Sequence, residues 1–407
     1  MAAATKKLKL KPVEEQVIVI TGASSGIGLV TARAAAKRGA RVVLSARNER
    51  ALQRAVADIE AAGGQAIYVV ADVADERDVD HLADVAVREF GGFDTWVNNA
   101  SVAIYGRLDQ VSVEDMRRLF DVNFWGVVHG CNAALPHLKA RGGVLVNVGS
   151  VLSDRAIPLQ GIYAAAKHAV KAYTDTLRME LEREGAPVSV TLVKPASIDT
   201  PFFQHARNYL SHEPKPAPPV YDPKVAAETI LAVAARPVRD VFVGGAGKMV
   251  SLSGTYAPRL TDKAMERSQF EGQQYADRPS PPRRPDNLYA PMDALEGVER
   301  GIYDGPVRES STYTAAALHP VASTLAAVGL GLALAASVRA LRGRRADDVD
   351  DLDDAGDAGD ADDVDGLYAL QHADDSADRP TGRRRTSSRR TGTGLADGAE
   401  SRFHVPS

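Results

Sequence analysis

Short apolar runs alternate with longer segments of helical pattern over the first 245 residues of the chain. The runs are rich in β-branched residues, which is typical of buried strands, and lie at 17–20, 41–45, 66–70, 95–97, 144–148, 188–193 and 241–243. The segments between them predict helices at 29–38, 49–62, 76–90, 113–139, 162–184 and 224–235. Strands that are apolar throughout and separated by helices indicate a parallel sheet covered on both faces. We therefore expect an α/β fold with a doubly wound parallel sheet of about seven strands.

Candidate site residues follow the ends of the predicted strands. They are Gly22, Arg47, Asp72, Asn99, Ser150 and Pro195. The carboxyl ends of parallel strands meet at one edge of a sheet, and folds of this class bind their ligands there. We therefore expect these residues to surround a single site.

A glycine-rich turn links the first predicted strand to the first helix. Residues 21–28 have the sequence TGASSGIG, with the glycines spaced G-x-x-x-G-x-G. A strand, a glycine turn and a helix N-terminus together present backbone N–H groups to a pyrophosphate. The candidate dinucleotide-binding residues of this turn are Gly22, Ser24, Ser25, Gly26, Ile27 and Gly28. A glycine turn without a ligand is the alternative.

Tyr163 and Lys167 are four residues apart in a predicted helix, so both side chains lie on one face. Tyrosine titrates near pH ~10, too high for useful proton exchange at neutral pH. A nearby ammonium favours the phenolate, and we therefore expect Lys167 to lower the pKa of Tyr163 toward the working pH of a general acid/base. A packed aromatic is the alternative for Tyr163. Ser150, at the end of a strand thirteen positions upstream, argues against that alternative.

Together these motifs resemble the short-chain dehydrogenase/reductase family over about residues 13–245. Besides the glycine turn, the matching residues are Asp72, Val73, Asn98, Asn99, Ala100, Asn123, Ser150, Tyr163, Lys167, Pro195 and Thr200. The resemblance implies a Rossmann-type fold and an oxidoreductase that interconverts a carbonyl and an alcohol with a nicotinamide cofactor. The chain departs from the family pattern at Ser101 and Ala196, since glycine is common in the family at both positions.

The resemblance also implies a role for each matching residue. Tyr163 would exchange a proton with the substrate oxygen, and Lys167 would support it and bind the nicotinamide ribose. Ser150 would orient the substrate oxygen, and Asn123 would hold the water of a proton relay. The expected cofactor-binding residues outside the turn are Arg47, Asp72 at the adenine, Val73, Asn99 on the floor of the nucleotide cleft, Tyr163, Lys167, Pro195 and Thr200.

The end of the second strand bears on the choice of cofactor. Dehydrogenases that select NAD usually place a carboxylate there to bind the ribose 2′-hydroxyl. Here Ala46 takes that place and Arg47 follows. A guanidinium can bind a 2′-phosphate through two charge-assisted hydrogen bonds, so we expect NADP(H) rather than NAD(H). A solvated loop arginine is the alternative for Arg47.

The substrate is encoded less clearly. Apolar residues that we expect near it are Ile104, Tyr105, Leu152, Ile157, Leu159, Phe202 and Phe203. Such a lining suits a lipophilic carbonyl or alcohol, although the same side chains could pack the loops onto the body. Two other functions remain open: an NAD(H)-dependent secondary-alcohol dehydrogenase, and a membrane-associated nucleotide-binding scaffold without turnover. The family often dimerises through two long helices, here 113–139 and 162–184, so we expect a homo-oligomer.

Composition narrows the alternatives. The net charge of −4 gives no reason to expect a nucleic-acid partner, and no cluster of metal ligands stands out in the sequence. The one cysteine, Cys131, excludes an intramolecular disulfide and suits a reducing compartment, and we expect it to pack in the core. Residues 1–12 carry lysines without a following apolar stretch, which predicts a solvated basic arm before a body at 13–245 and a cytoplasmic location.

The chain changes character after residue 245. We expect an extension at 246–314 with one or two helices at 248–270, a proline-rich connector at 278–285 and an irregular segment laid over the body. Residues 321–338 contain no charge, and together with 315–320 they predict an apolar helix of borderline length for a membrane span. Arginines follow this segment, and the positive-inside rule would place them in the cytoplasm. The cofactor domain before the segment also needs the cytosol, and a single crossing cannot leave both flanks on the same side. Contact along the membrane surface and packing on a partner are therefore alternatives to a span. The acidic then basic tail, 339–407, predicts disorder.

Overall fold

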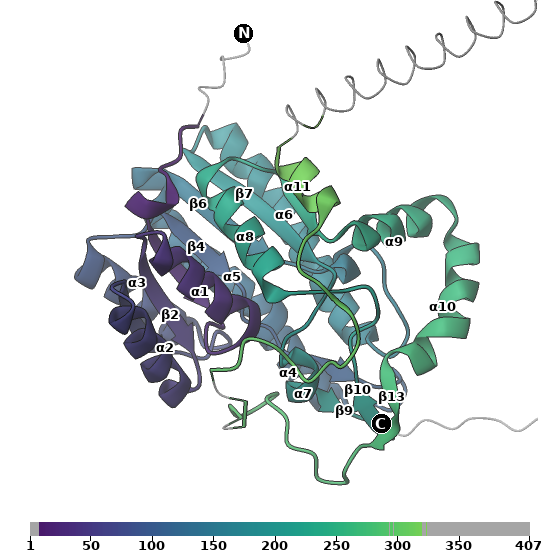
Figure 1. Cartoon of the computed structure of the whole chain (residues 1–407). Helices are drawn as coiled ribbons and strands as arrows, with labels where there is room; N and C mark the ends of the chain where they lie inside the picture. Colours follow the sequence, from purple (N-terminus) through teal and green to yellow (C-terminus); the bar gives the residue numbers. More distant parts are fainter. Residues whose placement is uncertain (1–7, 293, 296, 320–322, 324–407) are drawn as a thin grey trace, which may run out of the picture. The chain divides into compact units, whose positions relative to one another are not determined.

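The seven apolar runs form the seven parallel strands of one sheet, in the order β12-β7-β6-β4-β1-β2-β3 (Figure 1). The computed structural model describes residues 8–292, 294–295, 297–319 and 323. The strands are β1 Val17–Thr21, β2 Arg41–Ala46, β3 Gln65–Val70, β4 Thr95–Asn98, β6 Gly143–Val148, β7 Val188–Pro195 and β12 Asp240–Val243. The strand order reverses between β1 and β4, which confirms the predicted Rossmann-type, doubly wound sheet and places the ligand crevice at this point.

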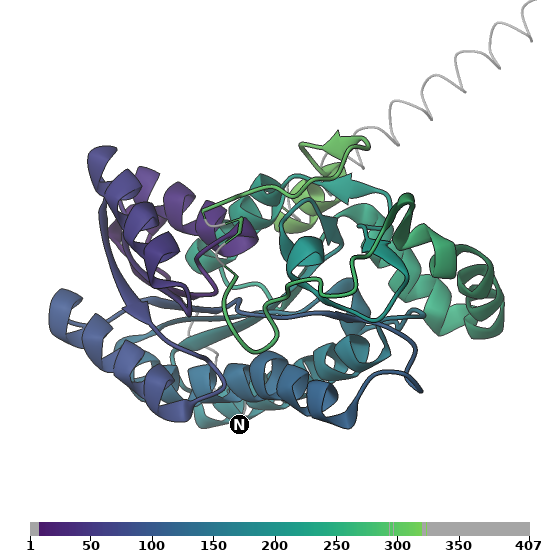
Figure 2. The same ribbon diagram turned by 90° about the horizontal axis from the view of Figure 1, so that it is seen from below.

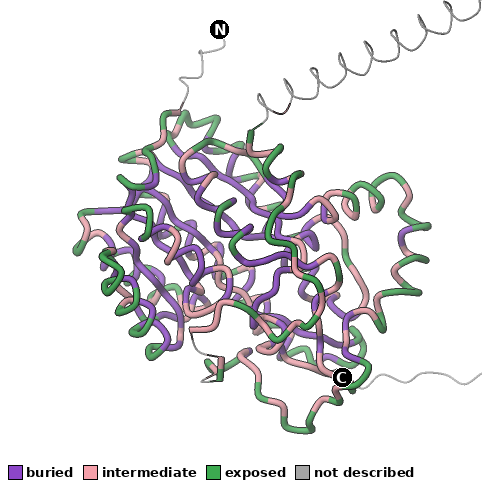
Figure 3. Tube along the Cα trace, in the orientation of Figure 1, coloured by how far each residue is buried: buried purple, intermediate pink, exposed green. Residues whose placement is uncertain are grey.

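Helices cover both faces of the sheet (Figure 2). One face carries α1 Gly26–Lys37, α2 Glu49–Ala61 and α8 Pro223–Ala235; the other carries α3 Glu76–Phe90, α4 Val113–Phe120, α5 Gly126–Arg141 and α6 Gly161–Glu184. Successive residues of a strand point to opposite faces, so Ile18 and Ile20 join one hydrophobic cluster while Val17 and Val19 join the other. Figure 3 shows the resulting buried layer along the strands. Cys131 is buried in this core, as expected.

The single helix predicted at 113–139 is interrupted. Between α4 and α5 the chain forms one π-helical turn, Asp121–Trp125. In this turn Asn123 is buried, and its side-chain oxygen accepts from the N–H of Val102 at 2.8 Å while its amide donates to the carbonyl of Val102 at 2.9 Å. The wider turn lets both Val122 and Asn123 face inward, and π turns of this kind are frequent at functional sites.

The extension contains two helices, as expected, α9 Gly245–Tyr256 and α10 Pro258–Gly272. The remaining elements are short: η1 Val13–Glu15, β5 Ile104–Tyr105, η3 Val151–Ser153, β8 Ser197–Ile198, α7 Phe202–His205, β9 Arg207–Asn208, β10 His212–Pro214, β11 Val220–Tyr221, β13 Gln274–Pro279, β14 Val307–Arg308 and α11 Thr312–Leu318. β13 pairs antiparallel with β10, so the start of the predicted proline-rich connector is tied to the body.

Two expectations concern the end of the chain. Among the described residues, no helix is both long and apolar enough to cross a membrane. The expected apolar helix at 315–338 falls within the described part only up to residue 319 and at 323, and the expected disordered tail at 339–407 lies outside it.

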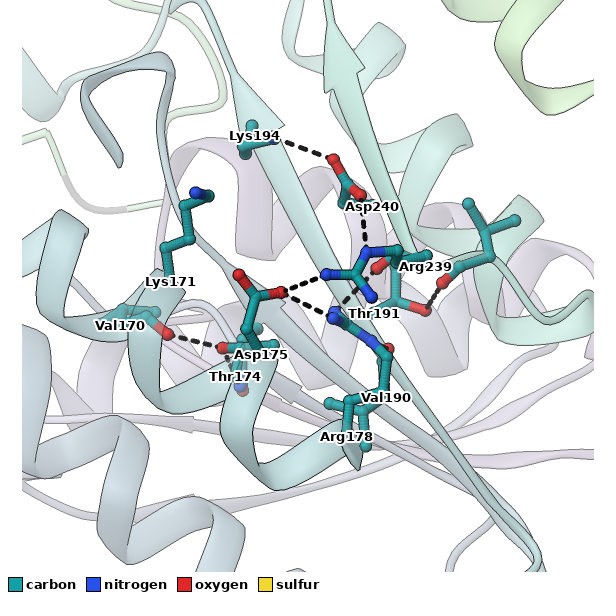
Figure 4. A network of polar contacts seen from close by, with 12 residues as sticks. Val170, Lys171, Thr174, Asp175, Arg178, Val190, Thr191, Lys194, Arg239 and Asp240 are labelled. Carbon is teal, nitrogen blue, oxygen red and sulfur yellow. Dashed lines mark hydrogen bonds and ion pairs between the residues drawn. The ribbon is translucent and has the colours of Figure 1, made fainter. Parts of the chain in front are cut away.

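A polar network fixes α6, which carries Tyr163 and Lys167, to the sheet (Figure 4). Arg178 is buried, and its guanidinium donates to the carbonyl of Val190 at 2.9 Å, to the carbonyl of Arg239 at 3.0 Å and to the carboxylate of Asp175 at 2.7 Å. Asp175 also accepts from Arg239 at 3.0 Å. These contacts join the helix to β7 and to the chain just before β12, so they set the position of the helix on the sheet.

We expect Arg178→Met to lower the free energy of unfolding by about 3 kcal/mol, because it removes the donor to the Asp175 carboxylate, the buried carbonyl of Val190 and the carbonyl of Arg239. Arg88→Met is the control: the Arg88 side chain is 62% exposed and pairs with Glu89 at the surface, so its loss should cost less than about 0.5 kcal/mol. Urea denaturation followed by circular dichroism measures both. Equal losses in the two variants would contradict the anchoring role.

Candidate active site

A cavity of about 370 Å³ opens at the carboxyl ends of the strands. The predicted site residues that line it are Gly22, Ser24, Ser25, Gly26, Ile27, Arg47, Asp72, Val73, Asn99, Ser150, Tyr163, Lys167, Pro195 and Thr200. Gly28 and Asn123 were predicted in the same site but do not line the cavity. The parallel sheet therefore brings the glycine turn and the Tyr-Lys pair together from positions far apart in the sequence.

The glycine turn packs tightly between β1 and α1. Gly22 has φ +66°, and a Cβ there would lie 2.7 Å from the Cα of Ala100. A Cβ on Gly28 would lie 2.2 Å from the carbonyl oxygen of Gly22, so Gly28 contributes the close approach of α1 rather than a surface of the cavity. The Asn99 amide donates to the carbonyls of Thr21 at 2.9 Å and Gly22 at 3.1 Å, which holds the turn in place. The turn and the first residues of α1 thus form a bare backbone cradle that suits a pyrophosphate.

Lys167 is almost fully buried, and its ammonium donates to the carbonyl of Val148 at 2.9 Å. The ammonium nitrogen lies 5.7 Å from the centre of the Tyr163 ring. Ser150 follows β6 by two residues, and its hydroxyl oxygen accepts from the N–H of Leu152 at 3.0 Å. The same hydroxyl is hydrogen-bonded to Tyr163. The hydrogen bond to Val148 therefore fixes Lys167, and with it α6, beside the strand that positions Ser150.

The pKa of Tyr163 does not fall toward neutral pH, contrary to the expectation. Burial raises the pKa of Tyr163 to about 12, and hydrogen bonds from the hydroxyls of Ser150 and Ser101 act against this rise. Burial also lowers the pKa of Lys167 to about 8. The physical reason is desolvation, which disfavours the charged form of both groups and which the spacing of residues in the sequence does not reveal.

Ser101 also belongs to the site, although the sequence predicted no role for it and showed only a departure from the family pattern. It lines the cavity, and its hydroxyl donates to the side-chain oxygen of Asn123 at 3.1 Å. The same hydroxyl can turn its one proton from Asn123 to Tyr163, and that hydrogen bond lowers the pKa of the phenol. Ser101 therefore connects Asn123 to Tyr163. The signal in the sequence that could have identified Ser101 as a site residue is the hydroxyl itself, at a position where glycine is common in the family.

The residues expected at the adenosine half of the cofactor are engaged with one another and with the extension. Asp72 accepts from Arg118 at 2.5 Å and from the N–H of Ala74 at 3.1 Å. The Arg47 guanidinium donates to the carbonyls of Asn287, Leu288 and Tyr289. Arg47 is thus not a solvated loop arginine, since three of its N–H groups bond to the extension.

The other end of the cavity is mostly apolar. Of the expected substrate-facing residues, Tyr105, Leu152, Ile157, Phe202 and Phe203 line it, whereas Ile104 and Leu159 pack in the core. The two helices of the extension contribute further lining residues, which the sequence analysis did not anticipate: Ala246, Gly247 and Val250 from α9, and Met265 and Gln269 from α10. The Tyr163 ring packs edge-on against Phe202, with centroids 5.8 Å apart, so the apolar end adjoins the Tyr-Lys pair.

Comparison with known proteins agrees with this geometry. The family model described as short chain dehydrogenase matches residues 16–210. An uncharacterized oxidoreductase, YxnA, of Bacillus subtilis is 49% identical over 328 residues, which cover 80% of this chain and 91% of the relative. That match extends beyond the body into the extension. The chain therefore belongs to the short-chain dehydrogenase family, and it is an oxidoreductase that acts on CH–OH groups with NAD(P).

Two solved structures resemble the body of the protein. A short chain dehydrogenase/reductase of Burkholderia phymatum in complex with NAD is 29% identical, with a TM-score of 0.56, over 63% of this chain and 96% of that chain. An alcohol dehydrogenase of the archaeon Thermococcus sibiricus, complexed with 5-hydroxy-NADP, is 28% identical, with a TM-score of 0.50, over 56% of this chain and 95% of that chain.

We expect Gly28→Ala to lower the free energy of unfolding by about 2 kcal/mol or more, because its Cβ would overlap the carbonyl of Gly22. Gly272→Ala is the control, since no heavy atom lies within 4 Å of its Cβ and its stability should stay the same or rise slightly. Thermal unfolding of both variants measures the difference. A Gly28→Ala protein as stable as the wild type would refute the tight packing of the turn.

Proposed function

We propose that the protein is an NADP(H)-dependent oxidoreductase that interconverts a carbonyl and an alcohol on a lipophilic small molecule. One observation carries this proposal: Ser150, Tyr163 and Lys167 line the same cavity as the glycine-rich turn. A cofactor cradle beside an acid/base pair is what hydride transfer coupled to proton transfer needs. A nucleotide-binding scaffold without turnover would have no use for that pair.

The side chains act on the proton and on the substrate oxygen. When bound, the nicotinamide cofactor supplies or accepts the hydride. Tyr163 donates its phenolic proton to the substrate oxygen during reduction and takes it back during oxidation. Ser150 donates a hydrogen bond to the same oxygen and stabilises the charge that develops there. Lys167 places a positive charge near the phenolate that Tyr163 leaves, and its bond to Val148 keeps that charge in position.

The preference for NADP(H) rests on the end of β2. Ala46 offers no carboxylate that would repel a 2′-phosphate, and Arg47 lines the cavity beside it. The Nη1 and Nη2 atoms of Arg47 donate to the extension, and a guanidinium has five N–H groups in all, so a phosphate can still be bound by the others. The hydrogen bonds of Arg47 to the extension favour the NAD(H)-dependent alternative, because they leave the guanidinium less available to a 2′-phosphate. Turnover rates with the two cofactors decide between them.

A lipophilic substrate fits the lining of the cavity. Tyr105, Leu152, Ile157 and Phe202 line the cavity together with Tyr163, and α9 and α10 add Val250 and Met265 to its lining. Burial of apolar surface in such a cavity favours a ligand with a hydrocarbon body and one oxygen at the reacting carbon.

We also propose a homo-oligomer that forms through α5 and α6. The π-helical turn that leads into α5 carries Trp125 with 48% of its surface exposed, and α6 carries Met179 with 58% exposed. Large apolar side chains exposed on these two helices suit a helical interface between copies of the chain. Sedimentation velocity measures the assembly.

We expect Tyr163→Phe to reduce turnover by a factor of about 100 to 10,000, because the proton donor is lost while the ring remains. Cofactor affinity should stay within about twofold of the wild type. Nicotinamide absorbance with each cofactor, over a panel of lipophilic ketones and secondary alcohols, measures turnover. Equal turnover in the variant and the wild type would disprove the catalytic assignment, and inactivity of the wild type on the whole panel would disprove the substrate class.

Ser101→Ala should move the pH profile of alcohol oxidation. Oxidation needs deprotonated Tyr163, and the hydrogen bond from Ser101 lowers the pKa of that group. Loss of the bond raises the pKa, so the inflection of kcat/KM should move to higher pH by up to about one unit. Ser101→Thr should restore it. Ser268→Ala, an exposed serine on α10 that bonds only its own helix, is the control and should leave the profile unchanged. An unshifted profile in Ser101→Ala would remove Ser101 from the acid/base system.

A further inference from the structure

Residues 284–292 of the extension lie across the adenosine half of the cavity; we call this segment the strap. It begins at the end of the proline-rich connector and forms part of the green coil near the carboxyl edge of the sheet (Figures 1 and 2). Asn287, Pro291 and Met292 of the strap line the same cavity as the glycine turn.

The strap is firmly bound to the body. Arg284 donates to the carbonyls of Phe203 at 3.0 Å and of Gln204 at 2.6 Å. The Leu288 side chain is completely buried in the hydrophobic core. The hydroxyl of Tyr289 donates to Asp115 at 2.9 Å. A segment with a charged anchor, an apolar anchor and a hydrogen-bonded anchor is held in a defined position and is not a loose connector.

Further anchors connect Asp286 and Asn287 to the body. The carboxylate of Asp286 pairs with Arg207 at 2.7 Å and accepts from the N–H of Leu288 at 3.0 Å, which shapes the turn. The N–H of Asn287 donates to the carbonyl of His205 at 2.9 Å. The backbone on both sides of the Asn287 side chain is therefore fixed.

The strap also contacts the residues expected to bind adenosine. Arg47 donates to the carbonyls of Asn287 and of the two residues that follow it. Asn48 donates to the carbonyl of Met292 at 3.1 Å. Arg118, the partner of Asp72, donates to the carbonyl of Leu288 at 3.1 Å. The end of β2, the end of β3 and the strap therefore form a single hydrogen-bonded unit around this half of the cavity.

Within the strap, the Asn287 side chain has a polar atom without a partner among the described residues. The side-chain oxygen of Asn287 is buried and makes no hydrogen bond to the described residues, although the residue lines the cavity. A buried amide oxygen without a donor is costly, which indicates that its donor comes from a ligand. The ends of β2 and β3 are where a dinucleotide places its adenosine, and a ribose hydroxyl is a donor of suitable size there.

We propose that the strap is a wall of the cofactor site and that Asn287 accepts a hydrogen bond from a hydroxyl of the adenosine ribose. This inference rests on the proposed function, because it requires a nicotinamide dinucleotide in the cavity. The strap adds a binding residue from outside the Rossmann body and covers the adenosine half of the cavity. Bound cofactor therefore orders the strap further, and the strap slows the release of the cofactor. Asn287 is thus a binding residue contributed by the extension.

The first test compares Asn287→Ala with Asn132→Ala, the same substitution at an exposed position on α5. Quenching of protein fluorescence measures the dissociation constants of NADPH, NADH and the fragment 5′-AMP. We expect Asn287→Ala to weaken each by roughly three- to tenfold, the effect of one lost hydrogen bond, and the control to leave them unchanged. The melting temperature should stay the same, because the side-chain oxygen has no partner in the free protein. Weaker binding of the dinucleotides without weaker binding of 5′-AMP would overturn the assignment to the adenosine half.

The second test follows the strap directly by hydrogen exchange in the full chain. Addition of the tighter-binding reduced cofactor should slow exchange of the N–H groups at 286–290 at least fivefold, while the turn at residues 62–64, away from the cavity, stays the same. Unchanged exchange in the strap together with unchanged affinity in Asn287→Ala would overturn the inference while the proposed function stands. A wild-type protein that binds neither cofactor would overturn both.

Discussion

The hydrogen bond between the ammonium of Lys167 and the carbonyl of Val148 holds the site together. It joins the helix that carries Tyr163 to the strand that ends just before Ser150, so one contact sets the relative position of three functional groups. The bond is buried, and a charge in that place needs a partner, because an unpaired ammonium would be strongly destabilising. The polar network of Arg178 and Asp175 then holds the far part of the same helix on the sheet. The contacts that pack α6 on the sheet therefore also set the positions of Tyr163 and Lys167 in the site.

The sequence predicted the sheet well, because each strand is a short apolar run and the pattern depends only on local composition. All seven expected strands form, and the expected residues meet at their carboxyl ends. The π turn at Asn123 could not be predicted in this way, since it depends on hydrogen bonds to Val102, more than twenty residues away in the chain. The direction of the Tyr163 pKa shift could not be predicted for a similar reason. Desolvation by the surrounding protein dominates the shift, and the spacing of residues in the sequence contains no information on burial.

The two departures from the family pattern have different outcomes. Ser101 brings a hydroxyl between Asn123 and Tyr163, so it changes the chemistry next to the proton donor. Ala196 also lines the cavity, and its N–H donates to the carbonyl of Val243 at 3.0 Å, which ties the chain after β7 to β12. Ser101 therefore changes the polar groups next to the proton donor, whereas Ala196 leaves the course of the backbone between β7 and β12 in place. A departure from a motif thus becomes informative when the atoms that it adds reach a functional group.

The helices α9 and α10 contribute Val250 and Met265 to the lining of the cavity. These residues follow the whole Rossmann body in the chain, whereas Ser150, Tyr163 and Lys167 lie within it. Part of the cavity lining is thus encoded in a stretch of the chain separate from the residues of proton transfer. Substitutions in these two helices can change the shape of the cavity and leave Ser150, Tyr163 and Lys167 in place.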